Sequence, residues 1–168
     1  GALGSRGAWL LEEYIDRPGH FGMATQSMEY VYDVAKNGLN SGFQVNTHAI
    51  GDRANREVLD QYEKVFKMNP NKAKDHRWRI EHAQHIDPAD IPRFGQMRVI
   101  AAIQAIHMSS DRPWAINRLG GKRIVDGAYV WRDLMDTGAV LVNGTDAPVE
   151  PIDPIASIYA SVTRRTLS

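Results

Sequence analysis

The chain has 168 residues, 43% hydrophobic and 24% charged, which is the composition of a folded globular protein. Its 20 basic and 20 acidic side chains cancel, so charge gives no reason to expect nucleic acid or an anionic membrane as a partner. The absence of cysteine excludes disulfides and thiolate metal sites, so any bound metal must use His, Asp or Glu.

The first part of the chain predicts a loop, a helix, a strand and a second helix. Residues 1–24 are rich in glycine and lack periodicity, which indicates a loop. Apolar side chains then recur at helical spacing over residues 25–39, with Thr25 as the expected N-cap. A short strand is predicted over residues 43–48, and Asp52 is expected to cap the following helix.

The second part of the chain continues this alternation of helices and strands. Strands are predicted over residues 77–82, 99–104 and 139–143, and helices over about 88–97, 126–136 and 154–163. Such alternation requires parallel strands joined by crossover helices, which is an α/β fold. Four strands suffice for a small open sheet or for half of an eight-stranded barrel, and spacing alone does not choose between the two.

Four polar side chains follow the ends of the four predicted strands. His48 ends the first strand, His82 ends the second, His107 follows the third, and Asp146 lies three residues beyond the fourth. In a parallel α/β barrel all strand carboxyl ends open on one face, so these side chains are expected to converge there. Two neutral imidazoles and a carboxylate suit Zn²⁺ or a similar divalent ion.

Such a set of residues is suited to hydrolysis. A bound zinc ion lowers the pKa of water from about 15.7 towards about 7, and a nearby carboxylate can pass the water proton to a leaving amine. Each residue also has a structural interpretation. His48 and His82 could be core histidines bonded to the backbone, and Asp146 lies in a turn-like sequence where it could form an Asx turn. His107 could be a substrate contact or a loop side chain.

Other polar residues near these positions are interpreted as structural. Asp52 is more economically a helix cap than a catalytic group. Strand alternation points Glu81 away from the side chain of His82. The remaining histidines, His20, His76 and His85, have polar or turn-like neighbours and are expected to be exposed.

Three segments resemble successive signatures of the amidohydrolase superfamily. They are His48-Ala49-Ile50-Gly51-Asp52, Ile80-Glu81-His82-Ala83-Gln84 and Gly144-Thr145-Asp146-Ala147-Pro148-Val149-Glu150. Within that superfamily the chain is most similar to the YtcJ-like group, which includes N-substituted formamide deformylases. Residues 1–6 and the segment Gln104-x-x-His107 with Asp111 also resemble that group. The likeness covers essentially the whole chain in collinear order.

The resemblance implies a TIM-type (β/α)₈ barrel with one or two divalent metals, zinc being expected, at its carboxyl-terminal mouth. This chain would be a single partial barrel domain, residues 1–168, supplying strands five to eight. Residues 1–24 would form an active-site loop region and residues 25–168 the β/α units. His48 and His82 would bind the second metal, Asp146 would contact the first metal and act as catalytic proton shuttle, and His107 would face substrate. The family's His-x-His pair and its metal-bridging residue on strand four have no counterpart here.

The leading hypothesis is therefore a metal-dependent hydrolase that cleaves a C–N bond in a small amide-like substrate. The alternative is a non-catalytic α/β barrel fragment or binding module that lacks a complete metal site. A third possibility, a flavodoxin-like open sheet, would need a glycine-rich phosphate loop, and the sequence has none. We expect either a missing amino-terminal barrel half or a homodimer partner to cover the open sheet edges. No apolar run approaches the roughly 20 residues needed to cross a bilayer, and the cytoplasm is the expected compartment.

Overall fold

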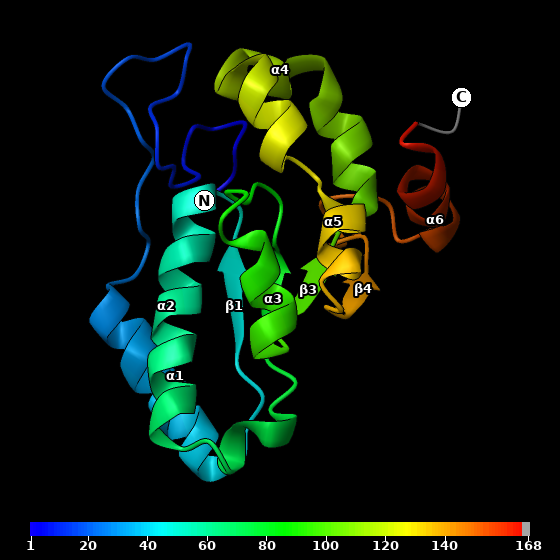
Figure 1. Cartoon of the computed structure of the whole chain (residues 1–168). Coiled ribbons are helices and arrows are strands. Elements are labelled where there is room, and N and C mark those ends of the chain that lie inside the picture. The colour runs from blue at the N-terminus through cyan, green and yellow to red at the C-terminus, as the bar shows by residue number, and fades with distance from the viewer. Residues whose placement is uncertain (166–168) are drawn as a thin grey trace.

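A computed structural model, which describes residues 1–165, shows a parallel four-stranded sheet with helices packed along it (Figure 1). The elements are α1 (Met28–Ser41), β1 (Asn46–Ala49), α2 (Asp52–Met68), the 3₁₀ helix η1 (Lys72–Asp75), β2 (Arg79–His82), α3 (Ile91–Met97), β3 (Ile100–Ile103), α4 (Ala105–Gly127), α5 (Trp131–Asp136), β4 (Leu141–Asn143) and α6 (Pro154–Thr163). The last three residues of the expected domain, 166–168, lie outside the described part. Within residues 1–165, no helix combines the length and apolar character that a membrane crossing requires.

The strands follow one another in the sheet in the order of the sequence, β1-β2-β3-β4, and all neighbours are parallel. Each crossover therefore advances the sheet in the same direction. A flavodoxin-like sheet reverses direction after its first crossover, so that alternative is wrong. The parallel α/β fold predicted from the sequence is confirmed, and the sequential order is the order found in a barrel.

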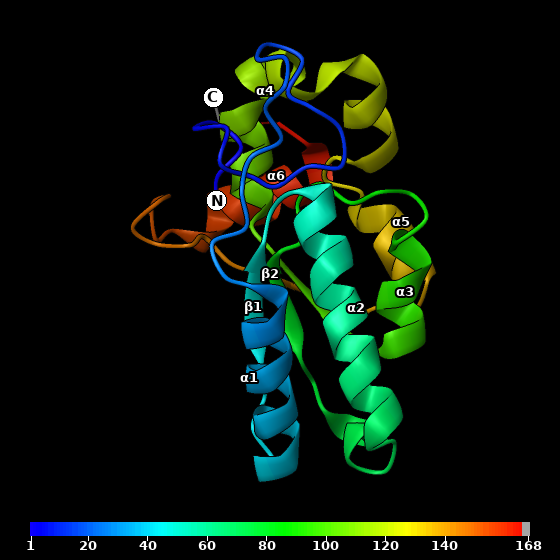
Figure 2. The ribbon, with the colours of Figure 1, turned by 90° about the vertical axis from the view of Figure 1, so that its left-hand side faces the viewer.

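The two faces of the sheet differ in burial. Side chains that face α2, α3 and α5, such as Ile80 and Ala101, are fully buried and belong to the main core with Trp78 and Phe94. Figures 1 and 2 show these three helices along one side of the strands. On the opposite face Asn46 and His48 of β1 are exposed, and Arg79 and Glu81 of β2 are half-buried. That second face would be the interior of a closed barrel.

The first helix begins and ends later than the sequence predicts. Its N-cap is Ser27, whose side chain accepts a hydrogen bond from the Tyr30 N–H at 3.2 Å, and not Thr25. The helix continues through Gly38 to Ser41. It stops at Gly42, whose φ of 76° is the left-handed conformation that glycine adopts at helix ends.

The largest difference from the predicted elements lies after β3. The helix expected near residues 126–136 is the short α5, and the preceding stretch forms the long α4. Pro113 and Gly120 lie inside α4, and Gly120 has a non-helical φ of 78° and ψ of 162°. These two residues interrupt the helical pattern, because proline and glycine are usually helix breakers. The observed α4 is thus two helical segments joined at Gly120.

The amino-terminal loop is firmly packed over the end of the sheet. Leu3, Leu10 and Tyr14 form a second small core with α4. Gly51 is the N-cap of α2, and a Cβ there would lie 2.0 Å from the Trp9 carbonyl oxygen, so only glycine fits. Asp52 is the first residue of α2, where its carboxylate accepts a bond from the Leu11 N–H at 2.9 Å. Instead of capping α2 as predicted, Asp52 ties the loop to that helix.

Two histidines that were expected to be exposed are buried. His76 is 8% exposed and His85 is 3% exposed. The Nδ1 atom of His76 accepts a hydrogen bond from the Trp78 N–H at 2.8 Å, and its ring stacks on Phe66 at 4.1 Å. Tertiary packing, such as that of His76 against Phe66, buries these histidines in spite of their polar neighbours in sequence, which explains the wrong expectation.

His76 should make the stability of the fold depend on pH. Burial lowers the pKa of His76 below 6.5, so the unfolded chain takes up a proton at a higher pH than the folded chain. The stability contributed by neutral His76 is therefore complete above about pH 6.5 and lost as the pH falls towards the folded-state pKa. The urea midpoint should fall between pH 7.5 and pH 5, and fall less in His76→Asn. Equal decreases in both proteins would contradict this assignment.

Candidate functional site

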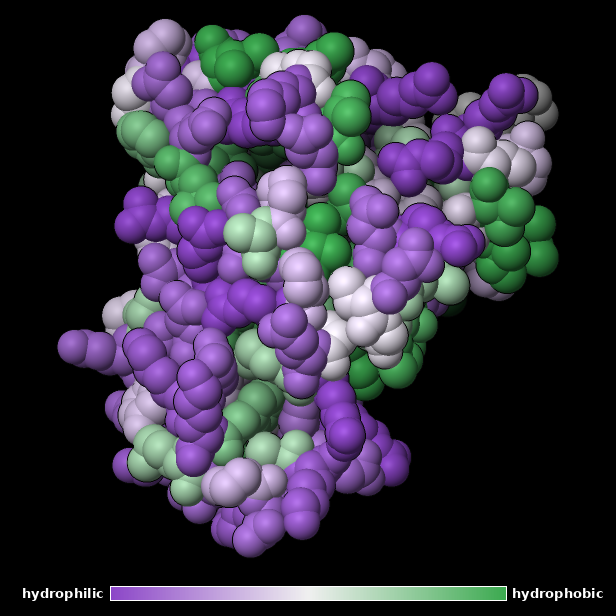
Figure 3. Space-filling model, viewed as in Figure 1, coloured by the Kyte–Doolittle hydropathy of each residue, from purple (hydrophilic) through white to green (hydrophobic). Residues whose placement is uncertain are grey.

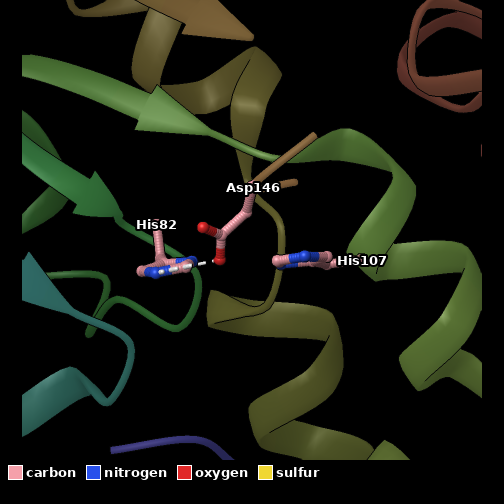
Figure 4. Close-up of side chains that lie close together, drawn as sticks. All are labelled: His82, His107 and Asp146. Carbon is pink, nitrogen blue, oxygen red and sulfur yellow. Dashed lines mark ion pairs between the residues drawn. The ribbon is translucent and has the colours of Figure 1, made fainter. Parts of the chain in front are cut away.

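Three of the four side chains singled out in the sequence form one cluster at the carboxyl end of the sheet. His82 is the last residue of β2, His107 lies in the first turn of α4, and Asp146 lies in the loop after β4. Each offers one ligand atom within 4.8 Å of the others. Figure 4 shows the Asp146 carboxylate between the two imidazole rings. His82 Nε2 lies 3.8 Å from Asp146 Oδ2. The rings of His82 and His107 are nearly parallel, with an interplanar angle of 16°.

His48 is the fourth predicted side chain, and it lies beside the cluster in contact with His82. Its ring meets the His82 ring edge-on, with 4.5 Å between their centroids. On its other side, His48 Nε2 lies 3.2 Å from the amine nitrogen of Gly1. The structure thus brings the ring of His48 beside that of His82, whereas the group with ligand atoms within 4.8 Å of one another consists of His82, His107 and Asp146. The metal-binding and substrate-binding roles of these four residues stay predictions.

The contact between His48 and His82 depends on how β2 ends. In the sheet register His48 lies opposite Glu81, whereas His82 lies opposite Ala49, so regular strands would place the two imidazoles on opposite faces. However, the backbone turns left-handed at His82, with φ of 75°, and at Ala83, with φ of 42°. This turn brings the His82 ring to the side of His48. Left-handed conformations cost roughly 1–3 kcal/mol each for residues other than glycine, so the surrounding structure must stabilise them.

Electrostatics keep the imidazole of His82 neutral. Burial is the main cause that lowers the pKa of His82 to about 4, and the nearby His48 adds to the effect against the opposing charge of Asp146. The pKa of His48 is also lowered, chiefly by desolvation. At pH 7 the contact between His82 and Asp146 is therefore not an ion pair. Both side chains have lone pairs free for a shared cation.

The donor set fits a divalent ion. His107 Nε2 is a buried nitrogen atom without a hydrogen-bond partner among residues 1–165, and His82 turns its Nε2 towards Asp146. Buried polar atoms are nearly always bonded, so unpaired ones at a cluster indicate a ligand site. Imidazole nitrogens with a carboxylate oxygen are ligands that Zn²⁺ accepts. Asp146 remains 41% exposed, which leaves its carboxylate accessible from the solvent side.

Sequence reasoning missed a polar network directly behind this cluster. Gln84, Asp111 and Tyr129 are joined by hydrogen bonds between their side chains, and Gln84 and Tyr129 are each 5% exposed. Gln84 and Asp111 each lie in a segment that carried the family resemblance, but their chemistry was not interpreted. Tyr129 gave no signal, because a single tyrosine between two predicted elements is usually a packing residue.

Comparison with known proteins places the whole chain in one family. The model of the amidohydrolase family matches residues 1–168. Protein LONG AFTER FAR-RED 3 of Arabidopsis thaliana is 40% identical over 98% of this chain and 28% of its own length. The Bacillus subtilis protein YtcJ, an amidohydrolase by name, is 37% identical over 99% of this chain and 30% of its own length.

Solved structures agree with this assignment. Uncharacterized metal-dependent hydrolases from Pyrococcus furiosus and Pyrococcus horikoshii are both 32% identical to this chain, with TM-scores of 0.85 and 0.87. The match covers 97% and 98% of this chain and 32% of each solved chain. The chain thus spans about a third of the length of the relatives that it matches. With a matching family model and shared folds over nearly its whole length, the chain belongs to the amidohydrolase family.

Proposed function

We propose that this chain supplies the metal-binding half of a hydrolase that cleaves a C–N bond in a small amide-like substrate. The observation that carries the proposal is the convergence of His82, His107 and Asp146, with ligand atoms within 4.8 Å of one another. Family membership supports it, as does the structural match to proteins described as metal-dependent hydrolases. The carboxyl end of a parallel sheet is also where α/β barrels place their active sites.

His48, His82 and Asp146 would hold the divalent ion, with zinc as the first candidate because the donors are imidazoles and a carboxylate. When bound, the ion supplies Lewis acidity for activating water. The Asp146 carboxylate would accept a proton from the attacking water and deliver it to the leaving nitrogen as the C–N bond breaks. The products are a carboxylic acid and an amine. His107, on the far side of Asp146 from His82, would contact the substrate.

The open surfaces of the chain support the further proposal that a second half completes this site. Among residues 1–165, β1 and β4 each have one edge without a partner strand, and Val140 beside β4 is 58% exposed. A cavity of about 250 Å³ runs along β1 beside His48, lined with apolar side chains of α1 and α2. Figure 3 shows further hydrophobic side chains over α6, where Ile155 and Val162 are exposed. The other barrel half, or a second copy of the chain, would cover the strand edges.

Titration with zinc tests the ligand assignment directly. We expect the 168-residue chain to bind zinc. We expect His48→Ala and His82→Ala to weaken binding by about 100-fold or more, because disturbing even an indirect metal contact weakens binding about 10–100-fold. Competition with a chromophoric chelator measures the affinity, and His20→Ala, outside the cluster, serves as the control. Loss of affinity in His107→Ala but not in His48→Ala would transfer the ligand role to His107. A chain that binds neither zinc, manganese nor nickel would favour the non-catalytic module.

Substitution of Asp146 tests the proposed proton transfer. In the completed barrel, Asp146→Asn should leave the fold intact and reduce kcat by about 10²–10⁴, the usual contribution of a general acid–base group. Amidase assays measure kcat, and circular dichroism on the same preparations checks that the variant is folded. Near-normal turnover in the variant would remove Asp146 from the mechanism.

The open edges predict that the chain alone associates and does not catalyse. An exposed apolar strand edge pairs readily with another chain, so light scattering should detect dimers or larger species. Val140→Lys should shift that distribution towards monomer, because a charged edge side chain opposes pairing. A stable wild-type monomer with metal-dependent amidase turnover would show that no complementary half is needed.

A further inference from the structure

We propose that Asp111 is a positioning residue that, through Gln84 and Tyr129, holds the imidazole of His82 in the candidate metal site. This inference rests on the proposed metal-binding role of His82, and it assigns a function to a buried network that the hydrolytic mechanism does not use. Asp111 is not placed among the groups that contact metal or substrate. Its role is to fix the backbone turn on which the direction of His82 depends.

The orientation of His82 depends on the backbone turn that carries it. Histidines that bind metals are normally oriented by a hydrogen bond from the second ring nitrogen to a carboxylate, a carbonyl or water. Among residues 1–165, His82 Nδ1 has no hydrogen-bond partner of normal geometry, although, against the larger lowering by burial, the nearby Gln104 side chain raises the pKa of His82. The ring direction depends first on the backbone, which is left-handed at His82 and at the fully buried Ala83. Contacts that stabilise this turn therefore also fix the direction of the His82 side chain.

Gln84, the next residue, is bonded through both its side chain and its backbone. Its Nε2 atom donates to Asp111 Oδ2 at 2.8 Å and lies 2.9 Å from the Tyr129 hydroxyl. Its carbonyl oxygen accepts from the Tyr129 N–H at 2.8 Å. These bonds fix Gln84 immediately after the left-handed turn. If Gln84 were released, the turn could relax to an extended backbone that points His82 to the opposite face of the sheet.

Asp111 connects the turn to the helix that carries His107. Its Oδ2 atom accepts hydrogen bonds from Gln84 and, at 2.6 Å, from the Tyr129 hydroxyl. Asp111 lies on α4 one turn after His107, so the two side chains share a face of that helix. A single carboxylate thus links the end of β2 to the start of α4 across 27 positions of sequence. His82 and His107 stand on the two elements that it joins.

Two variants and one matched control separate positioning from general stability. Asp111→Asn keeps the shape of the side chain but removes its charge, and Tyr129→Phe removes only a hydroxyl. Tyr62→Phe also removes a buried, bonded hydroxyl, but that hydroxyl contacts Thr47 and Arg79 away from the metal cluster. For wild-type protein and each variant we would measure three properties. They are the zinc affinity, the urea midpoint, and the nuclear Overhauser effect between the rings of His48 and His82 in metal-free protein.

We expect Asp111→Asn and Tyr129→Phe to weaken zinc binding about 10–100-fold, as other indirect metal contacts do. They should also remove the ring–ring Overhauser effect without metal, whereas Tyr62→Phe should keep both properties at a comparable urea midpoint. Unchanged zinc affinity and an unchanged Overhauser effect in the two variants would overturn the proposal. If wild-type protein binds no zinc but the Overhauser effect still requires Asp111, the positioning role stands and the proposed metal site falls.

Discussion

Parallel pairing in sequential order is the constraint on which the candidate site depends. Because β1 to β4 pair in chain order, their carboxyl ends lie along one edge of the sheet. The residues that follow those ends are therefore neighbours in space although they are up to about 100 positions apart in sequence. The core on the helix side fixes the positions of the strands. The side chains at the carboxyl ends of the strands are therefore held in fixed positions as well. A site built on rigid elements holds its ligands more closely than one built on loops alone.

Burial and charge are balanced differently across the cluster. His82 lies at the protein side and is kept neutral by desolvation, whereas Asp146 lies at the solvent side and is 41% exposed. A neutral imidazole can bind a cation without first losing a proton. An accessible carboxylate can exchange protons with substrate and water. The burial of His82 thus suits cation binding, and the exposure of Asp146 suits proton transfer. Residue type alone predicts neither the burial nor the exposure.

The sequence predicted which strand ends carry the polar side chains, because apolar runs and their termini are local features. It did not predict how His48 and His82 meet, since that contact depends on a left-handed backbone at His82 that alternation does not reveal. The long α4 was missed because Pro113 and Gly120 interrupt its pattern. The burial of His76 follows from packing against Phe66. For His76 a tertiary contact overrides the local signal, whereas for α4 the local signal itself is misleading.

The polar network also explains how half of a barrel could carry an organised site. One face of the sheet remains open, and Arg79 and Glu81 form an ion pair there, 3.0 Å apart and partly solvated. By contrast, the bonds that connect Gln84, Asp111 and Tyr129 are buried or partly buried and lie within segments that this chain supplies itself. The direction of His82 is therefore determined before any complementary half arrives. Completion of the barrel would then exclude water and add ligands around histidines already in place, rather than organise them.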